Sequence, residues 1–186
     1  MGKFQKDKTI ILVALPAELP ADRLIGWNIA YVGVGKVNAA INGAKAVQKC
    51  EVDTVINYGT AGAVGPKISG LCEVTSFFHR DMDARPLGFS LGETPFEAGI
   101  EINLGRPGYT IGTGDSFTQT APELVTDLVD MEAYSLAKLA GSFGKYFFCF
   151  KFVSDQADGN AAADWDTSVS MGADLFIEHL TKLSHQ

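Results

Sequence analysis

Carboxylate, hydroxyl and glycine residues gather directly after several short apolar runs of this 186-residue chain. These polar segments cover residues 14–18, 32–40, 57–62, 114–117, 129–133 and 152–158. In an open α/β sheet, ligands bind at the carboxyl ends of the strands. We therefore expect the segments to meet at one site, where carboxylates would transfer protons and glycines would let a ligand approach the backbone.

Two of these segments carry a carboxylate that could have either a functional or a purely structural role. Glu132 lies four residues before Leu136 and seven before Leu139, so it shares the apolar stripe of a predicted helix. A buried carboxylate there needs a partner or a ligand. Ser154 and Asp155 follow a strand, where they could serve a reaction or simply cap a helix. The residues alone leave that choice open.

The surrounding pattern predicts alternating strands and helices. Apolar runs rich in β-branched residues predict buried strands at residues 9–15, 29–34, 54–58, 73–78, 108–112 and 146–154. Apolar residues recur at helical spacing in three sets: Val37, Ala40, Ile41, Ala44 and Val47; Leu136, Leu139, Ala140 and Phe143; and Leu175, Phe176, Leu180 and Leu183. Strands buried on both faces, with helices between them, predict an α/β sandwich on a largely parallel or mixed sheet.

The chain is predicted to form a single domain spanning residues 1–186, since its length suits one core and no linker or repeat interrupts it. Residues 80–107 are rich in Gly and Pro and lack periodicity. A loop of that length in a compact domain is more often functional than idle.

Charge and hydropathy exclude several classes of protein. The net charge is −7, and the short lysine-bearing start is the largest basic cluster, which argues against a nucleic-acid surface. No apolar stretch approaches the roughly 18–20 residues of a membrane span. The first apolar run ends at Pro16 and is followed by Glu18, so it predicts a buried strand rather than a signal peptide. We expect a cytoplasmic protein.

The cysteines predict neither a metal site nor a nucleophile. Cys50, Cys72 and Cys149 are widely spaced, and they form no C-x-x-C pair and no zinc spacing with histidine. No histidine stands in a pattern that would activate one of them as a catalytic thiolate. We expect reduced, mostly buried thiols and no cofactor.

Five motifs, taken in order, resemble the purine nucleoside phosphorylase / methylthioadenosine–S-adenosylhomocysteine nucleosidase superfamily. They are Gly-Val-Gly-Lys-Val-Asn-Ala-Ala at 33–40, Asn-Tyr-Gly-Thr-Ala-Gly at 57–62, Gly-Asp-Ser-Phe at 114–117, Asp-Met-Glu-Ala at 130–133 and Ser-Asp-x-Ala-Asp at 154–158. The resemblance implies a three-layer α/β/α sandwich around a mixed, barrel-like central sheet. It also implies a small purine nucleoside as ligand and a homodimer or larger homo-oligomer.

The resemblance further implies roles for individual residues. Asp155 would protonate N7 of the leaving purine, which requires a carboxyl group that keeps its proton near neutral pH, as a closed apolar pocket can arrange. Ser154 would orient Asp155. Glu132 would accept hydrogen bonds from the 2′- and 3′-hydroxyls of the ribose, and Met131 would pack beneath the sugar.

The same resemblance places the base. Phe117 would stack on it, and the backbone of Thr118 would read its hydrogen-bonding edge. Thr60, Ala61 and Gly62 complete the expected substrate-binding set. The small residues Ala61 and Gly62 would allow the base to approach the chain closely.

The attacking nucleophile distinguishes two branches of this superfamily. Phosphorylases hold phosphate with arginines, one of which precedes the Gly-Thr/Ser motif, and here that position is Asn57. The turn after the first strand offers Glu18 rather than an arginine. In the nucleosidase branch a glutamate at this position activates water, and a carboxylate repels phosphate. Both positions predict a hydrolase.

Other features leave the substrate open. The spans from Glu18 to Gly33 and from Phe117 to Asp130 are shorter than in typical relatives, and both border the expected place of the 5′ substituent. Lys151 stands where the nucleosidases usually have arginine. The candidates are 5′-methylthioadenosine, S-adenosylhomocysteine, futalosine and adenosine. A phosphorylase with an altered phosphate site and a non-catalytic nucleoside sensor are the alternatives, although a sensor needs no general acid.

Overall fold

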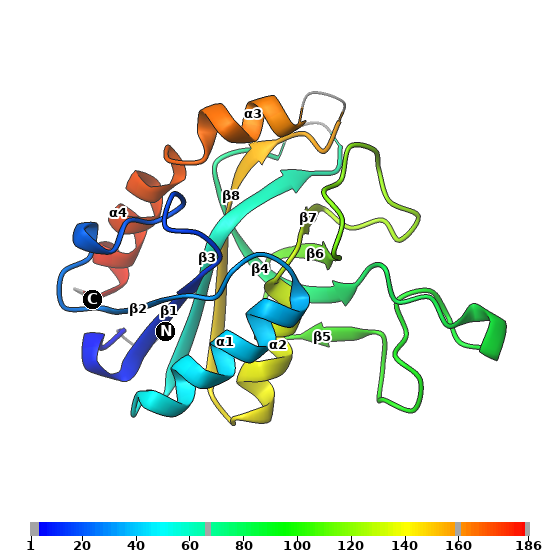
Figure 1. The fold of residues 1–186 in the computed structure, drawn as a ribbon, viewed down its shortest axis with the longest axis horizontal. Coiled ribbons are helices and arrows are strands. Elements are labelled where there is room, and N and C mark those ends of the chain that lie inside the picture. Colours follow the sequence, from blue (N-terminus) through cyan, green and yellow to red (C-terminus); the bar gives the residue numbers. More distant parts are fainter. Residues whose placement is uncertain (1–3, 66–67, 159–160, 185–186) are drawn as a thin grey trace.

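The computed structural model describes residues 4–65, 68–158 and 161–184 (Figure 1). Within these ranges the chain forms eight strands: β1 (Thr9–Val13), β2 (Asn28–Tyr31), β3 (Thr54–Ala63), β4 (Leu71–His79), β5 (Glu101–Asn103), β6 (Tyr109–Thr113), β7 (Leu128–Asp130) and β8 (Tyr146–Asp155). The helices there are α1 (Lys36–Lys49), α2 (Ala133–Ser142), α3 (Ala161–Ser168) and α4 (Gly172–Ser184), with short 3-10 turns at Lys6–Lys8, Ala21–Arg23 and Arg85–Leu87.

The sheet closes on itself into a mixed barrel. Its strands follow the order β2-β1-β3-β7-β6-β4-β5, and β8 pairs with both β3 and β4. The ring β3-β7-β6-β4-β8 is therefore closed, with β3–β8, β4–β6 and β6–β7 parallel and β3–β7 and β4–β8 antiparallel. Strands β1 and β2 extend the sheet from β3, and β5 extends it from β4. Closure leaves the ring without an unpaired edge, as in other barrels.

Helices cover the sheet on two sides, which completes the three layers expected from the resemblance. Figure 1 shows α1 and α2 on one side and α3 and α4 on the other. Strand β1 explains the arrangement, because alternate residues of a strand face opposite sides. Ile10 and Leu12 pack into the core beneath α1 and α2, whereas Ile11 and Val13 pack into the core beneath α4. The predicted fold class is confirmed.

Helix α1 is present as predicted, but its buried face matches the expected one only in part, at Val47. Val37 is 66% exposed and Ile41 is 51% exposed, whereas Ala39, Gly43 and Val47 are buried. A Cβ atom at position 43 would lie 3.1 Å from side-chain carbons of α2. The two helices therefore pack more closely than larger side chains would allow, and the small residues of α1 form the contact.

Several elements differ in length from the sequence pattern. Strand β3 does not end at Tyr58 but continues to Ala63, because β8 pairs along its length and β7 pairs at its end. The sequence pattern did not predict the short strands β5 and β7 or the helix α3, because they have no clear apolar period.

None of the helices in the described part of the chain has the length and hydropathy that a membrane crossing requires.

Candidate active site

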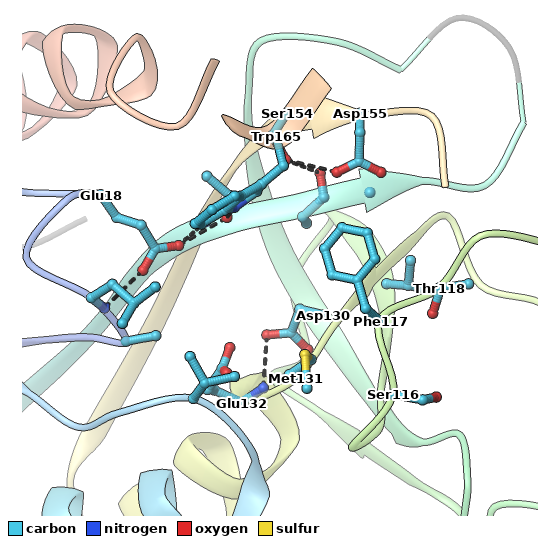
Figure 2. Close-up of a pocket in the computed structure, with 17 residues that line it drawn as sticks. Glu18, Ser116, Phe117, Thr118, Asp130, Met131, Glu132, Ser154, Asp155 and Trp165 are labelled. Atoms are coloured by element: carbon cyan, nitrogen blue, oxygen red, sulfur yellow. Dashed lines mark hydrogen bonds between the residues drawn. The ribbon is translucent and has the colours of Figure 1, made fainter. Parts of the chain in front are cut away.

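A cavity of about 280 Å³ opens where the chain leaves β1, β3, β7 and β8 (Figure 2). All ten residues that the sequence singled out line it: Asp155, Glu18, Glu132, Met131, Phe117, Thr118, Thr60, Ala61, Gly62 and Ser154. The structure adds Trp165, Asp130 and Val34 to the lining, among others. The expected meeting of these segments at one site is therefore observed.

Glu18 lies at one end of the cavity, where fixed donors hold its carboxylate. It follows β1 in a tight turn and is only 4% exposed. Its Oε2 atom accepts a hydrogen bond from the backbone N–H of Leu15 at 3.0 Å. Its Oε1 atom accepts two, from the backbone N–H and the hydroxyl of Thr60, each at 2.8 Å. A Cβ atom at position 59 would lie 3.2 Å from that Oε1 atom, so a glycine there leaves room for the carboxylate.

Asp155 lies at another end of the cavity, at the last residue of β8. Its carboxyl oxygens accept hydrogen bonds from the hydroxyl of Ser154 and the backbone N–H of Ala157, both at 2.8 Å. Burial raises the pKa of Asp155, and the negative charges of Asp164 and Asp158 add to the effect.

This turn differs from the helix cap that the sequence left open. Helix α3 begins at Ala161, so the hydrogen bond that the backbone N–H of Ala157 donates to Asp155 Oδ1 closes a local turn instead. Gly62 on the neighbouring strand β3 makes room for it, since a Cβ atom there would lie 2.7 Å from Asp155 Oδ1. The carboxyl group remains free to face the cavity.

Glu132 sits at the start of α2, where one of its oxygens meets the turn before α1. Its Oε1 atom accepts a hydrogen bond from the backbone N–H of Gly35 at 2.9 Å. Gly35 has a φ of 91°, a conformation that L side chains rarely adopt. Burial, together with the nearby charge of Asp130, raises the pKa of Glu132 to about 7. The partner that a buried carboxylate requires is thus supplied in part by the backbone.

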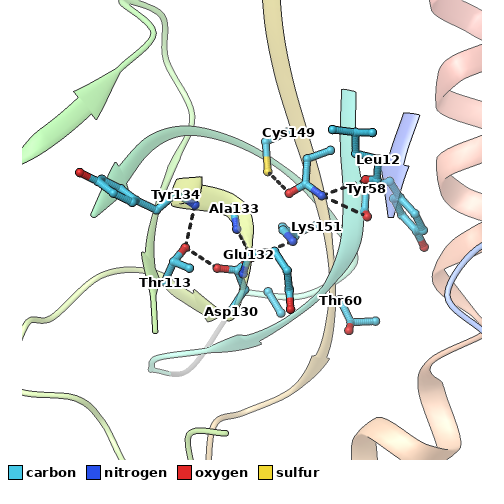
Figure 3. A network of polar contacts seen from close by, with 12 residues as sticks. Leu12, Tyr58, Thr60, Thr113, Asp130, Glu132, Ala133, Tyr134, Cys149 and Lys151 are labelled. Atoms are coloured by element: carbon cyan, nitrogen blue, oxygen red, sulfur yellow. Dashed lines mark hydrogen bonds and ion pairs between the residues drawn. The ribbon is translucent and has the colours of Figure 1, made fainter. Parts of the chain in front are cut away.

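A buried ion pair lies behind Glu132 (Figure 3). Lys151 Nζ approaches Asp130 Oδ2 at 2.8 Å, and both side chains are only 1% exposed. Asp130 also accepts hydrogen bonds from the hydroxyl of Thr113 at 2.5 Å and from the backbone N–H groups of Glu132 and Ala133. Although burial opposes the charge of Lys151, the attraction of Asp130 keeps its pKa above the usual value. Lys151 is therefore charged and forms an ion pair with Asp130.

A loop after β6 carries the residues expected to bind the base. The guanidinium group of Arg80 donates hydrogen bonds to the carbonyl oxygens of Ser116 at 2.5 Å and Gly114 at 3.4 Å. Arg80 is 8% exposed, and its position leaves no room for a side chain at 114, where a Cβ atom would lie 2.8 Å from Arg80 Cζ. Phe117 is 47% exposed at the cavity. No local pattern in the sequence indicated this contact of Arg80.

Asn57 lies in the sheet rather than at the cavity. Its side chain does not line the cavity; it is buried in the sheet and donates hydrogen bonds to the carbonyl oxygens of Leu12 at 3.0 Å and Tyr58 at 3.3 Å. The side chain of Asn57 therefore supplies no group that could bind phosphate in the cavity. The cavity lining contains four carboxylates, and no lysine or arginine occurs among the described residues that form it.

The chain also offers few sites for other chemistry. Cys50, Cys72 and Cys149 are free thiols, and burial raises the pKa of Cys149 to about 12. Over residues 4–65, 68–158 and 161–184, no group of three or more His, Cys, Asp or Glu side chains is arranged to hold a metal ion. Among the described residues that line the cavity, the acidic groups are Glu18, Asp130, Glu132 and Asp155.

Comparison with known proteins supports the resemblance drawn from the motifs. The family model of the phosphorylase superfamily matches residues 27–100. A solved structure of a putative 5′-methylthioadenosine/S-adenosylhomocysteine nucleosidase from Francisella philomiragia has a TM-score of 0.83 and 21% identity, with 96% of this chain and 99% of that chain covered.

Two further structures are similar. The futalosine hydrolase of Helicobacter pylori has a TM-score of 0.83 at 21% identity, with 94% of this chain and 96% of that chain covered. A 5′-methylthioadenosine/S-adenosylhomocysteine nucleosidase from Neisseria meningitidis, in complex with methylthio-immucillin-A, has a TM-score of 0.80 at 22% identity, with 96% and 100% covered. Together these matches establish the nucleoside phosphorylase-like fold.

Proposed function

We propose that this protein is a purine nucleosidase, which uses water to cleave the N-glycosidic bond of a purine nucleoside and releases the free base. The observation that carries the proposal is the composition of one cavity. It combines Asp155, whose pKa burial raises, with Glu18, which fixed donors orient, and it contains no cation in its described lining.

Asp155 acts as the general acid at N7 of the purine. When the bond between C1′ and N9 breaks, its electron pair moves into the purine, and a proton at N7 lets the base leave as a neutral molecule. A carboxylic acid can donate this proton only if it is protonated before the reaction. The raised pKa of Asp155 favours that state, and the Ser154 hydroxyl holds the group in place.

Glu18 acts as the general base. As positive charge develops at C1′, a water oxygen forms the new bond to that carbon, and the water proton passes to Glu18. The carboxylates of the cavity would repel inorganic phosphate, whereas a phosphate site needs arginine or lysine donors. Lys151 does not supply them, because it is paired with Asp130 at 2.8 Å.

The remaining residues position the substrate. Glu132 accepts hydrogen bonds from the 2′- and 3′-hydroxyls through the oxygen that Gly35 leaves open, and Met131 packs beneath the sugar. This role requires the ionised form of Glu132, which a pKa of about 7 makes available above neutral pH.

The base lies between the loop after β6 and the end of β3. Phe117 stacks on it, and the backbone of Thr118 pairs with its edge. Thr60, Ala61 and Gly62 form the opposite wall of this substrate-binding set. The small side chains of Ala61 and Gly62 allow the purine ring to lie against the strand.

The proposed substrate is 5′-methylthioadenosine, S-adenosylhomocysteine or a related purine nucleoside such as futalosine. The similar structures include nucleosidases for the first two compounds and a hydrolase named for the third. We further propose that the protein is cytoplasmic and forms a homodimer or larger homo-oligomer. Light scattering of the purified protein tests the oligomeric state.

A substrate panel tests the function. Purified protein is incubated with 5′-methylthioadenosine, S-adenosylhomocysteine, futalosine and adenosine in phosphate-free buffer, and base release is followed by chromatography. We expect rapid release from at least one of them and background release from the Asp155→Asn variant. Release only after phosphate is added would contradict hydrolysis, and release in neither buffer would contradict the whole proposal.

A further inference from the structure

Trp165 links the wall of the cavity to Glu18, although it lies in a helix that the sequence did not predict. It is a residue of α3 and lines the cavity (Figure 2). Its indole Nε1–H donates a hydrogen bond to Thr60 Oγ1 at 2.9 Å. That hydroxyl donates in turn to Glu18 Oε1 at 2.8 Å. The three side chains therefore form one chain of hydrogen bonds.

The direction of this chain is fixed by chemistry. An indole N–H is a donor and never an acceptor, whereas a hydroxyl group has one proton and two lone pairs. The indole therefore occupies a lone pair of the Thr60 hydroxyl, and the hydroxyl proton is left to point at Glu18. Together with the backbone N–H of Thr60, also at 2.8 Å, it gives Glu18 Oε1 two donors.

We propose that Trp165 is a positioning residue for the base that activates water. Its N–H orients the hydroxyl of Thr60, and the hydroxyl orients the carboxylate of Glu18 toward the water that attacks C1′. This inference rests on the proposed role of Glu18. A phenylalanine at this position would fill the same wall without the N–H, and the hydroxyl would then be free to rotate.

Trp165 could instead serve only as an apolar wall of the cavity, and the two roles predict different kinetic effects. If Trp165 only packs against the substrate, removal of its N–H changes substrate binding and therefore KM. If it positions the base, the loss appears in kcat, because misplacement of a catalytic group by a fraction of an ångström slows the chemical step. The effect must also depend on Thr60, through which it acts.

The test uses the four proteins of a double-mutant cycle: wild type, Trp165→Phe, Thr60→Val and the double variant. We expect Trp165→Phe to lower kcat about tenfold, the equivalent of one lost hydrogen bond, while KM stays within about twofold. In the Thr60→Val background the same substitution should have almost no further effect on kcat. A change confined to KM, or an equal loss of kcat in both backgrounds, would overturn the proposal.

The second tryptophan of the chain supplies the matched control. Trp27 packs against the core beneath α4 and lies outside the cavity, so Trp27→Phe should leave kcat and KM unchanged. This variant also leaves Trp165 as the single indole. Its Nε1–H proton resonance should move upfield when Thr60→Val is added, since the hydrogen bond is lost.

The resonance separates this inference from the proposed function. It reports the Trp165–Thr60 hydrogen bond in the folded protein whether or not any nucleoside is cleaved. An unchanged resonance would overturn the positioning role even if base release were observed. If the resonance shifts but the protein cleaves no nucleoside, the hydrogen bond between Trp165 and Thr60 exists and the proposed function is wrong.

Discussion

The two carboxylates proposed for proton transfer are buried to almost the same degree but have different surroundings. Glu18 is 4% exposed and Asp155 is 7% exposed. Glu18 accepts three hydrogen bonds, whereas Asp155 accepts two and has acidic neighbours that add to the effect of burial on its pKa. The comparison teaches that depth alone does not assign a base and an acid; the donors and charges around each group do.

The two groups also differ in how the chain holds them. The donors to Asp155 come from residues 154 and 157, so its turn is nearly independent of the rest of the molecule. The donors to Glu18 include Thr60, which is 42 residues away, and the chain of contacts continues to Trp165. Glu18 should therefore be more sensitive to distant substitutions than Asp155.

The largest effect is expected at the acid end. Asp155→Asn keeps the shape of the side chain but cannot donate an acidic proton, so base release should fall roughly 10³-fold. Affinity for a purine-base analogue should stay within about tenfold. Steady-state kinetics and calorimetric titration measure the two quantities.

Asp53→Asn is the matched control for that substitution. Asp53 is exposed and lies just before β3, at the end of the strand away from the cavity. The Asp53→Asn variant should therefore be as active as the wild type. Activity of Asp155→Asn within twofold of this control would exclude Asp155 as the general acid.

At the other end, Glu18→Gln should lower kcat by roughly 10²-fold, because an amide cannot take a proton from water. Glu51→Gln, which changes an exposed glutamate, serves as the control. Near-normal turnover of the Glu18→Gln variant would contradict the role of Glu18 as general base. Asp155 would then be the remaining group proposed for proton transfer.

The pH dependence of stability sharpens the comparison with a third carboxylate. Glu132 has a pKa of about 7 in the folded protein against 4.5 for an unperturbed glutamate. A raised pKa means that the folded state holds this proton more tightly. The contribution of Glu132 is therefore fully present below about pH 4.5 and is lost as the pH rises through 7.

Glu132→Gln has no proton to lose, so its free energy of unfolding should rise relative to the wild type over this range. The change between about pH 4.5 and pH 8 is on the order of 3 kcal/mol, from 1.36 kcal/mol per pKa unit. Urea unfolding at several pH values measures it. A difference between the two proteins that stays constant with pH would show that Glu132 titrates normally.

The smallest effect is expected at the loop that carries Phe117. Arg80→Lys keeps the positive charge but loses the planar guanidinium group that reaches the carbonyl oxygens of both Gly114 and Ser116. KM should rise a few-fold, by about 3–10, with little change in kcat. Arg23→Lys, at an exposed ion pair with Asp174, should leave both constants unchanged. A loss in kcat would place the loop in the chemical step instead.

Sequence patterns predicted the local parts of this molecule well and the long-range parts poorly. The ten candidate residues lie in the last part of a strand, in the turn or loop after one, or at the start of α2, so their common location was predictable from the order of the motifs. The contact of Trp165 with Thr60 spans 105 residues and lies in a helix with little apolar period, so no local signal indicated it. The buried face of α1 was predicted only in part, because close packing on α2 places Gly43 at the contact instead of a larger apolar residue.

The central claim is that water, not phosphate, attacks C1′. The most direct test is identification of the sugar product when the best substrate is cleaved in the presence of excess inorganic phosphate. We predict free sugar in amounts equal to the released base, at a rate that phosphate does not change, since the lining of the cavity offers carboxylates and no described cation. Sugar 1-phosphate as the product would contradict the account.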